Sequence, residues 1–164
     1  MLKSFDHLED LNFSLLMELY REGNEENGEY LYPEESPQRR LALAESDFRK
    51  YLSEDFFSCP NARYWIWCEN GRYLSALRLE PFRDGLLLEA LETHPDFRRL
   101  GHAKALLCAV LRQLPAGTTL YSEVSKKNAA SLATHRACGF TKLQDYSDFD
   151  GERSDRHVVL STTV

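Results

Sequence analysis

The sequence contains no hydrophobic run that approaches the roughly 20 residues needed to cross a bilayer, so we expect no transmembrane helix and no membrane partner. Near the N-terminus, Asp6, Glu9 and Asp10 stand where a signal peptide has an apolar core, and we therefore expect a cytoplasmic protein. Acidic residues outnumber basic ones, and the formal net charge is -6 at pH 7. That balance argues against nucleic acid as the main partner.

Cysteine is scarce, and its spacing shows no CxxC pair. The four cysteines are Cys59, Cys68, Cys108 and Cys138. We interpret them as reduced, buried thiols rather than as disulfides or metal ligands. The histidines are scattered among different predicted elements, so we expect no metal site.

The composition that remains is typical of one globular domain. The chain has 164 residues, of which 43% are hydrophobic and 28% are charged. Hydrophobic periodicity and turn residues predict an α/β (α+β) fold over residues 1–164, with helices and an antiparallel meander of three consecutive strands. We expect residues 23–37 to form a loop, with a helical turn within it as the alternative, because glycine and proline interrupt a polar stretch there. The predicted strands are 1–5, 62–68, 72–79, 86–93, 118–124, 140–146 and 157–164, and the predicted helices are 8–21, 36–56, 103–114 and 128–138.

A strand followed by a short turn and an amphipathic helix forms the centre of the chain. The first backbone N–H groups of such a helix have no partner within it, and the helix dipole favours negative charge at that end. Gly101 allows close approach to the backbone, while Arg98 and Arg99 add positive charge. The turn therefore predicts an anion site. A tight turn with two solvated arginines remains the alternative.

Two motifs in this half of the chain resemble those of the GNAT family of acyl-CoA-dependent N-acetyltransferases. The family's Gln/Arg-x-x-Gly-x-Gly/Ala motif corresponds to a run that begins at Arg98 and ends at Ala103. Its second signature, Asn followed eleven residues later by Gly-Phe, is present as Asn128 and Gly139-Phe140. The resemblance implies a single domain with a mixed, mostly antiparallel, V-split sheet flanked by helices, and acetyl-CoA as cosubstrate.

The resemblance also implies which residues hold the cofactor. In the family, the strand before the turn pairs through its backbone with the pantetheine arm, and the amides of the turn hold the pyrophosphate. The implied cofactor-binding residues are Leu91, Thr93, Arg98, Arg99, Leu100, Gly101, His102, Ala103, Lys104, Asn128 and Ser131.

Glu89 is our candidate for the general base. Strict alternation along the strand would place Leu87, Glu89, Leu91 and Thr93 on one face, beside the thioester, and Glu92 on the other. Family members carry catalytic bases at the positions of Glu89 and Leu87, of which Glu89 can titrate. A Glu89 that is salt-bridged or exposed at the sheet surface is the alternative.

His135 is our candidate for the general acid, at a position where the family usually has tyrosine. Asn128, Ser131 and His135 share one helix face that we expect to point toward the cofactor. Ala130, Ala133 and Ala137 form a separate stripe, which we expect to pack on the sheet. A histidine that merely lines the pocket is the alternative, and Tyr121 and Tyr146 are other candidate acids.

The resemblance implies an N-acetyltransferase that moves an acetyl group from acetyl-CoA to a primary amine by direct attack. A non-catalytic acyl-CoA-binding module of the same fold and an unrelated phosphate-binding module are the alternatives. We expect the choice of acceptor to depend on residues 23–37, 82–85 and 147–155. We expect the protein to be a monomer or a homodimer. Glutamates concentrated in residues 22–35 favour a cationic small molecule or a basic peptide N-terminus as acceptor.

Overall fold

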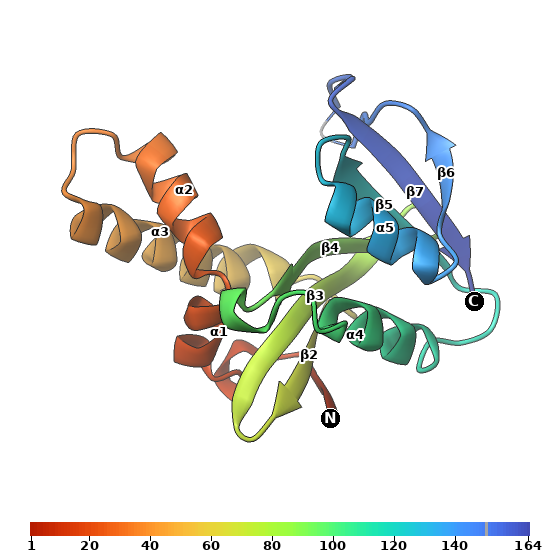
Figure 1. The fold of residues 1–164 in the computed structure, drawn as a ribbon, viewed down its shortest axis with the longest axis horizontal. Helices are drawn as coiled ribbons and strands as arrows, with labels where there is room; N and C mark the ends of the chain where they lie inside the picture. The colour runs from red at the N-terminus through yellow and green to blue at the C-terminus, as the bar shows by residue number, and fades with distance from the viewer. Residues whose placement is uncertain (150) are drawn as a thin grey trace.

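The computed structural model describes residues 1–149 and 151–164, and Figure 1 shows how its helices and strands follow one another along the chain. Short turns of 3₁₀ helix occur at Leu8–Asp10 and Pro95–Phe97, and a π-helical turn at Leu52–Phe56 extends the third helix. The strands are β1 Leu2–Phe5, β2 Arg63–Glu69, β3 Arg72–Phe82, β4 Gly85–Thr93, β5 Thr119–Ser125, β6 Thr141–Gln144 and β7 His157–Thr163. The helices are α1 Phe13–Leu19, α2 Arg21–Leu31, α3 Pro37–Tyr51, α4 His102–Leu111 and α5 Ala129–Ala137.

The strands of the described residues form one sheet in the order β1-β2-β3-β4-β5-β7-β6. Within that part of the chain, β4 and β5 are the parallel pair and the other neighbours are antiparallel. The β4–β5 pairing covers Leu86 to Leu88 on β4, and both strands then continue beyond it. The sheet is therefore split, and the predicted mixed, mostly antiparallel sheet is confirmed.

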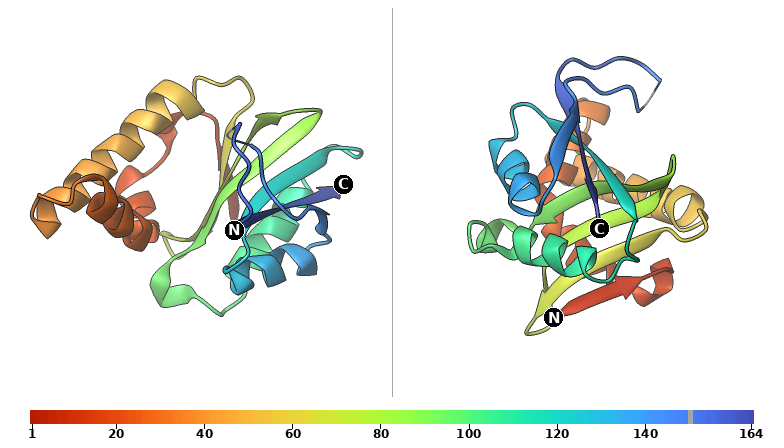
Figure 2. Two further views of the ribbon diagram at one scale, coloured as in Figure 1. Left: turned by 90° about the horizontal axis from the view of Figure 1, so that it is seen from above. Right: turned by 90° about the vertical axis from the view of Figure 1, so that its right-hand side faces the viewer.

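Helices cover both faces of the sheet, as the two views of Figure 2 show. The hydrophobic core on one face contains Leu16 of α1, Leu52 and Phe56 after α3, and Ile66 of β2. The core on the other face is built around α4, whose Leu106, Leu107 and Val110 pack against Leu77, Leu79, Leu88 and Leu120 of the sheet. The alternation of side chains along β2 and β3 supplies residues to both cores.

The prediction of a loop at residues 23–37 was wrong over its first half, because α2 runs from Arg21 to Leu31. Gly28 is buried against α3, and a Cβ at this position would lie 2.7 Å from the carbonyl oxygen of Arg40. Gly28, which sequence rules treat as a helix breaker, thus allows α2 and α3 to approach closely. The packing between the two helices outweighs the low helix propensity of glycine. Ser36 caps α3, and its hydroxyl accepts a hydrogen bond from the amide of Arg39.

The cysteines are free, but the prediction that they are buried holds for Cys68 and is wrong for the others, which are partly exposed. The Sγ atoms of Cys108 and Cys138 lie 3.2 Å apart, between α4 and the end of α5. Among the residues that the structure describes, no helix is both long and apolar enough for a membrane crossing. Asp150, within the residues 147–155 predicted to affect acceptor choice, lies outside the described residues.

Candidate active site

The turn between β4 and α4 exposes the N-terminus of α4. Arg99 and Gly101 both have positive φ, of 64° and 84°, and Gly101 occupies the N-cap position of the helix. No described side chain caps this helix by a hydrogen bond to its first amides. These N–H groups are therefore available to an anion, as the sequence predicts.

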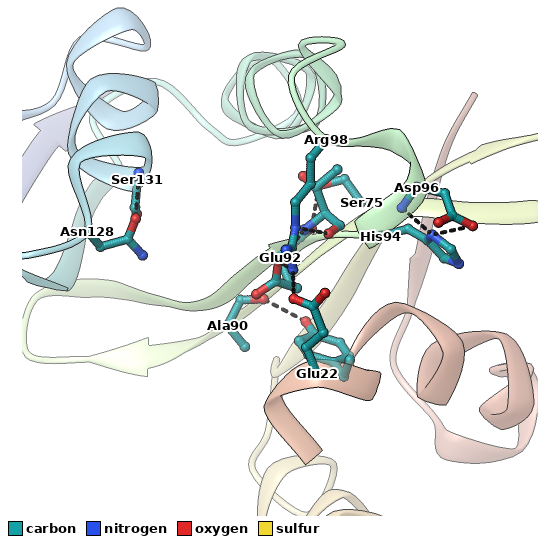
Figure 3. Close-up of polar contacts among 11 residues, drawn as sticks. Glu22, Ser75, Ala90, Glu92, His94, Asp96, Arg98, Asn128 and Ser131 are labelled. Carbon is teal, nitrogen blue, oxygen red and sulfur yellow. Dashed lines mark hydrogen bonds and ion pairs between the residues drawn. The ribbon is translucent and has the colours of Figure 1, made fainter. Parts of the chain in front are cut away.

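Arg98, predicted to add positive charge at the turn, is already in contact with carboxylates (Figure 3). Its guanidinium lies 2.7 Å from Glu22 of α2 and 3.4 Å from Glu92 of β4, and it also donates a hydrogen bond to the carbonyl of Thr93. The ion pair with Glu22 thus connects the glutamate-rich residues 22–35 to the turn. Arg99 and Lys104 bring further positive charge to the same place.

A cavity of about 730 Å³ lies beside the turn, between β4, α4 and α5. Of the predicted cofactor residues, Leu100 is the exception: its side chain is 67% exposed, and it is absent from the cavity wall. The predicted residues that line the cavity are Leu91, Thr93, Arg98, Arg99, Gly101, His102, Ala103, Lys104, Asn128 and Ser131.

The alanines of α5 contradict our expectation that they pack on the sheet. Ala130, Ala133 and Ala137 line the large cavity together with Thr134, a residue that sequence reasoning missed. The regular spacing of small residues was the signal for this wall, since small side chains leave room for a ligand as readily as for a neighbouring strand.

A smaller cavity of about 170 Å³ continues from the first into the split between β4 and β5. Leu91, Asn128 and Ser131 line both cavities and therefore mark where they meet. The inner wall includes the two predicted catalytic residues, Glu89 and His135. The fold thus brings the candidate base, the candidate acid and the anion-binding turn onto one connected space.

Asn128 lines both cavities and is the N-cap residue of α5. Its side-chain oxygen accepts a hydrogen bond from the amide of Ser131 at 3.0 Å, which makes it the N-cap of the helix (Figure 3). This cap fixes the first turn of α5, and with it the side chains of the helix face that begins at Asn128.

Strict alternation along β4 was a wrong prediction. Ala90 has a φ of 49°, and the register with β3 shifts between Glu89, which pairs with Arg78, and Glu92, which pairs with Ala76. A β-bulge therefore adds a residue at this point. Glu89 and Glu92 lie on the face covered by α1, α2 and α3, while Leu91 packs into the core around α4.

Glu89 is ion-paired, with its carboxylate 3.3 Å from the guanidinium of Arg78. The Arg78 side chain is 13% exposed and lies over the ring of Tyr51, 4.8 Å from its centroid. On the adjacent strand, burial and then the negative charge of Glu89 raise the pKa of Glu80. The Glu89 side chain is 34% exposed, so it keeps access to the cavity despite the ion pair.

His135 is 1% exposed, and its ring is fixed from two sides. Nδ1 lies 2.8 Å from the carbonyl oxygen of Ser131, one helical turn earlier, and the ring meets that of Phe140 edge to face at 5.0 Å. Nε2 is buried without a hydrogen-bond partner among the described residues. Burial lowers the pKa of His135 below its ordinary value of 6.5.

The alternative acids lie elsewhere. The hydroxyl of Tyr121 donates a hydrogen bond to Asp84 at 2.6 Å, and Arg153 lies over the ring of Tyr146. Neither tyrosine is on the wall of either cavity. Of the candidate acids, His135 is the one in the split of the sheet.

Comparison with known proteins agrees with this geometry. The model of the acetyltransferase (GNAT) family matches residues 17–140, more than half of the chain, while no curated protein matches. The PaiA N-acetyltransferase of Thermoplasma acidophilum, solved with coenzyme A, is similar in structure, with a TM-score of 0.64, 12% identity and coverage of 100% of this chain and 99% of that one.

Two further solved structures share the fold over nearly the whole of both chains. The ribosomal-protein-S18-alanine N-acetyltransferase of Escherichia coli has a TM-score of 0.59 and 19% identity, and covers 100% of this chain and 94% of its own. An N-acetyltransferase of Staphylococcus aureus Mu50 has a TM-score of 0.60 and 19% identity, with coverage of 99% and 97%. The chain belongs to the acetyltransferase (GNAT) family.

Proposed function

We propose that this protein is an N-acetyltransferase that transfers the acetyl group of acetyl-CoA to a primary amine. The observation that carries the proposal is the pair of connected cavities, which runs from the uncapped N-terminus of α4 to Glu89 and His135. One end suits a phosphate group, and the other has titratable groups beside an opening in the sheet.

The residues of the large cavity suit the parts of a CoA molecule. The amides from Arg99 to Lys104 would receive the pyrophosphate, with the charges of Arg99 and Lys104 beside it. The pantetheine arm would follow β4 past Thr93 and Leu91 and pass Asn128 and Ser131. Its thioester would then reach the small cavity between β4 and β5.

In the proposed mechanism the amine attacks the thioester carbonyl directly. An ammonium ion cannot attack, so Glu89 would accept a proton from it, either directly or through water. A strand N–H such as that of Leu91 would stabilise the oxyanion that develops on the carbonyl. His135 lines the small cavity, where the sulfur would leave.

The glutamate-rich residues 22–35 favour a cationic acceptor less strongly in the structure than they do in the sequence. Glu22 is paired with Arg98 and Glu25 with Arg21, while Glu29 lies 3.9 Å from Arg40. These contacts neutralise part of the negative charge on α2. We therefore restrict the proposed acceptor to a primary amine on a small molecule or peptide.

Calorimetry with acetyl-CoA, CoA and ATP tests the first half of the proposal. We expect binding of both CoA compounds and weaker binding of ATP, because the pantetheine arm supplies contacts that ATP lacks. A protein without affinity for CoA would refute the proposal. Binding of acetyl-CoA without turnover on any amine would instead support a non-catalytic acyl-CoA-binding module.

Glu89→Gln tests the base. With polyamines, aminoglycosides, amino acids and peptides as acceptors, we expect the turnover of the active pair to fall by about 100-fold or more, since general bases contribute on the order of 10² to 10⁴. Glu18→Gln, an exposed change on α1, is the matched control and should keep wild-type turnover. Unchanged turnover in Glu89→Gln would remove Glu89 as the base.

A further inference from the structure

His135 has a hydrogen-bonding pattern that fixes which of its nitrogens carries the hydrogen. Nδ1 lies 2.8 Å from the Ser131 carbonyl oxygen, which can only accept, and 3.3 Å from the Ser131 hydroxyl, which can donate or accept. The shorter contact, with the carbonyl, assigns the hydrogen to Nδ1, and the hydroxyl can accept from the same N–H. In the neutral ring, Nε2 then carries no hydrogen and is a proton acceptor, and it is this atom that is buried without a described partner.

The surroundings of His135 favour that neutral ring. The charged side chains of the cavity it lines are Glu89 on β4 and Glu123 on β5. Glu89 is paired with Arg78, and Glu123 lies 3.6 Å from His157 and also accepts a hydrogen bond from the Ser147 hydroxyl. Both carboxylates are thus engaged by other groups, and burial disfavours the imidazolium ion.

A neutral His135 with a bare Nε2 cannot supply the proton that the leaving thiolate needs. The overall reaction converts R–NH3⁺ and acetyl-S–CoA into R–NH–acetyl, HS–CoA and H⁺. The nitrogen therefore loses two protons, of which one reaches the solvent and one ends on sulfur. The first is removed before attack, the role proposed for Glu89, and the second leaves the nitrogen once the C–N bond has formed.

We propose that His135 is the acceptor of this second proton and returns it to the sulfur. Nε2 takes the proton from the nitrogen of the tetrahedral adduct, the C–S bond breaks with its electron pair on sulfur, and Nε2–H protonates the thiolate. The ring ends neutral, as it began, with Nδ1–H still bonded to Ser131. This role rests on the proposed acetyl transfer and replaces the donor role that the sequence predicts for His135.

The tautomer can be measured in the wild-type protein without any substitution. In a protein with ¹⁵N-labelled histidine, we expect His135 to be neutral at about pH 7, with the hydrogen on Nδ1 and none on Nε2. Addition of CoA, whose thiol is a hydrogen donor, should shift the Nε2 resonance, whereas desulfo-CoA should not. An imidazolium ring, or an Nε2–H tautomer, at this pH would overturn the proposal.

Kinetics separates an acceptor from a donor. A histidine that donates must start protonated, so a donor role predicts that kcat falls as pH rises through the pKa of His135. We expect no such fall between about pH 7 and about pH 9. A descending limb that disappears in His135→Gln would overturn the acceptor role.

The variant His135→Gln measures directly how much His135 contributes to kcat. His135→Gln should lower kcat by about 100-fold or more while leaving the affinity for acetyl-CoA within a few-fold, because glutamine fills the site but cannot take up and release a proton. His7→Gln, an exposed change, is the control. Wild-type kcat in His135→Gln would refute the role of His135 while leaving the acetyltransferase intact, whereas absence of CoA binding in the wild type would refute the proposed function itself.

Discussion

The burial of His135 has a thermodynamic consequence that is independent of catalysis. Its pKa in the folded protein is lowered by burial, and in the unfolded chain it returns to about 6.5. Below that pH the unfolded chain binds the proton more readily than the folded one. This contribution to stability is therefore complete above about pH 6.5 and is lost as the pH falls.

We predict that the wild type loses more stability than His135→Gln between about pH 7.5 and about pH 5.5. Urea unfolding of both proteins at the two pH values measures this difference, and His7→Gln serves as a control for an exposed histidine. An identical pH dependence in the wild type and His135→Gln would show that burial does not lower the pKa of His135.

The candidate catalytic residues show how far single residues can be predicted from sequence. Motif spacing identified Glu89 and His135, and both lie on the wall of the inner cavity. The direction of the Glu89 side chain relative to Leu91 could not be predicted, because the bulge at Ala90 reverses the alternation. The ion pair between Glu89 and Arg78 was also missed, because it depends on how β3 and β4 align with each other. The residue pattern of a single strand does not specify that register.

At the scale of elements, the contact between α2 and α3 depends on one glycine. Gly28 faces the backbone of Arg40, whereas Gly23, on the same helix, has no atom within 4 Å of the place where a Cβ would lie. The two glycines therefore separate the effect of close packing from the effect of helix propensity.

We predict that Gly28→Ala lowers the free energy of unfolding by about 1 to 3 kcal/mol, because the new Cβ meets the Arg40 carbonyl and forces the helices apart. Gly23→Ala should raise it by about 0.5 to 1 kcal/mol, the usual gain in a helix interior. Urea denaturation measures both changes. Equal stability of the two variants would contradict the close contact between α2 and α3.

The elements that follow α3 were predicted more accurately than α2. The amphipathic helix α4 and the adjacent strands β2 and β3 depend on local patterns of residues, and the structure confirms them. Helix α2 has a polar sequence with glycines, and its stability comes from packing on α3, which is not visible in its own residues.

At the scale of the whole molecule, two hydrophobic cores share one sheet. On β2, Ile66 faces the core beneath α1 and α3, while its neighbour Trp65 faces the core beneath α4. Loss of either core removes the support of the same strands. The molecule should therefore unfold as one cooperative unit.

We predict that Leu52→Ala in one core and Leu106→Ala in the other each lower the free energy of unfolding by about 2 to 5 kcal/mol. Both side chains are fully buried. Circular dichroism and tryptophan fluorescence should report coincident transitions in each variant. Separate transitions, with one core unfolding before the other, would contradict this cooperativity.

Arg98 connects the large cavity with helix α2. Its guanidinium holds Glu22 of α2 and also lies on the wall of the large cavity. Any phosphate that takes Arg98 from Glu22 loosens α2 from the turn. By thermodynamic reciprocity, a ligand that drew Glu22 away from Arg98 would strengthen phosphate binding by the same factor by which phosphate would strengthen the binding of that ligand.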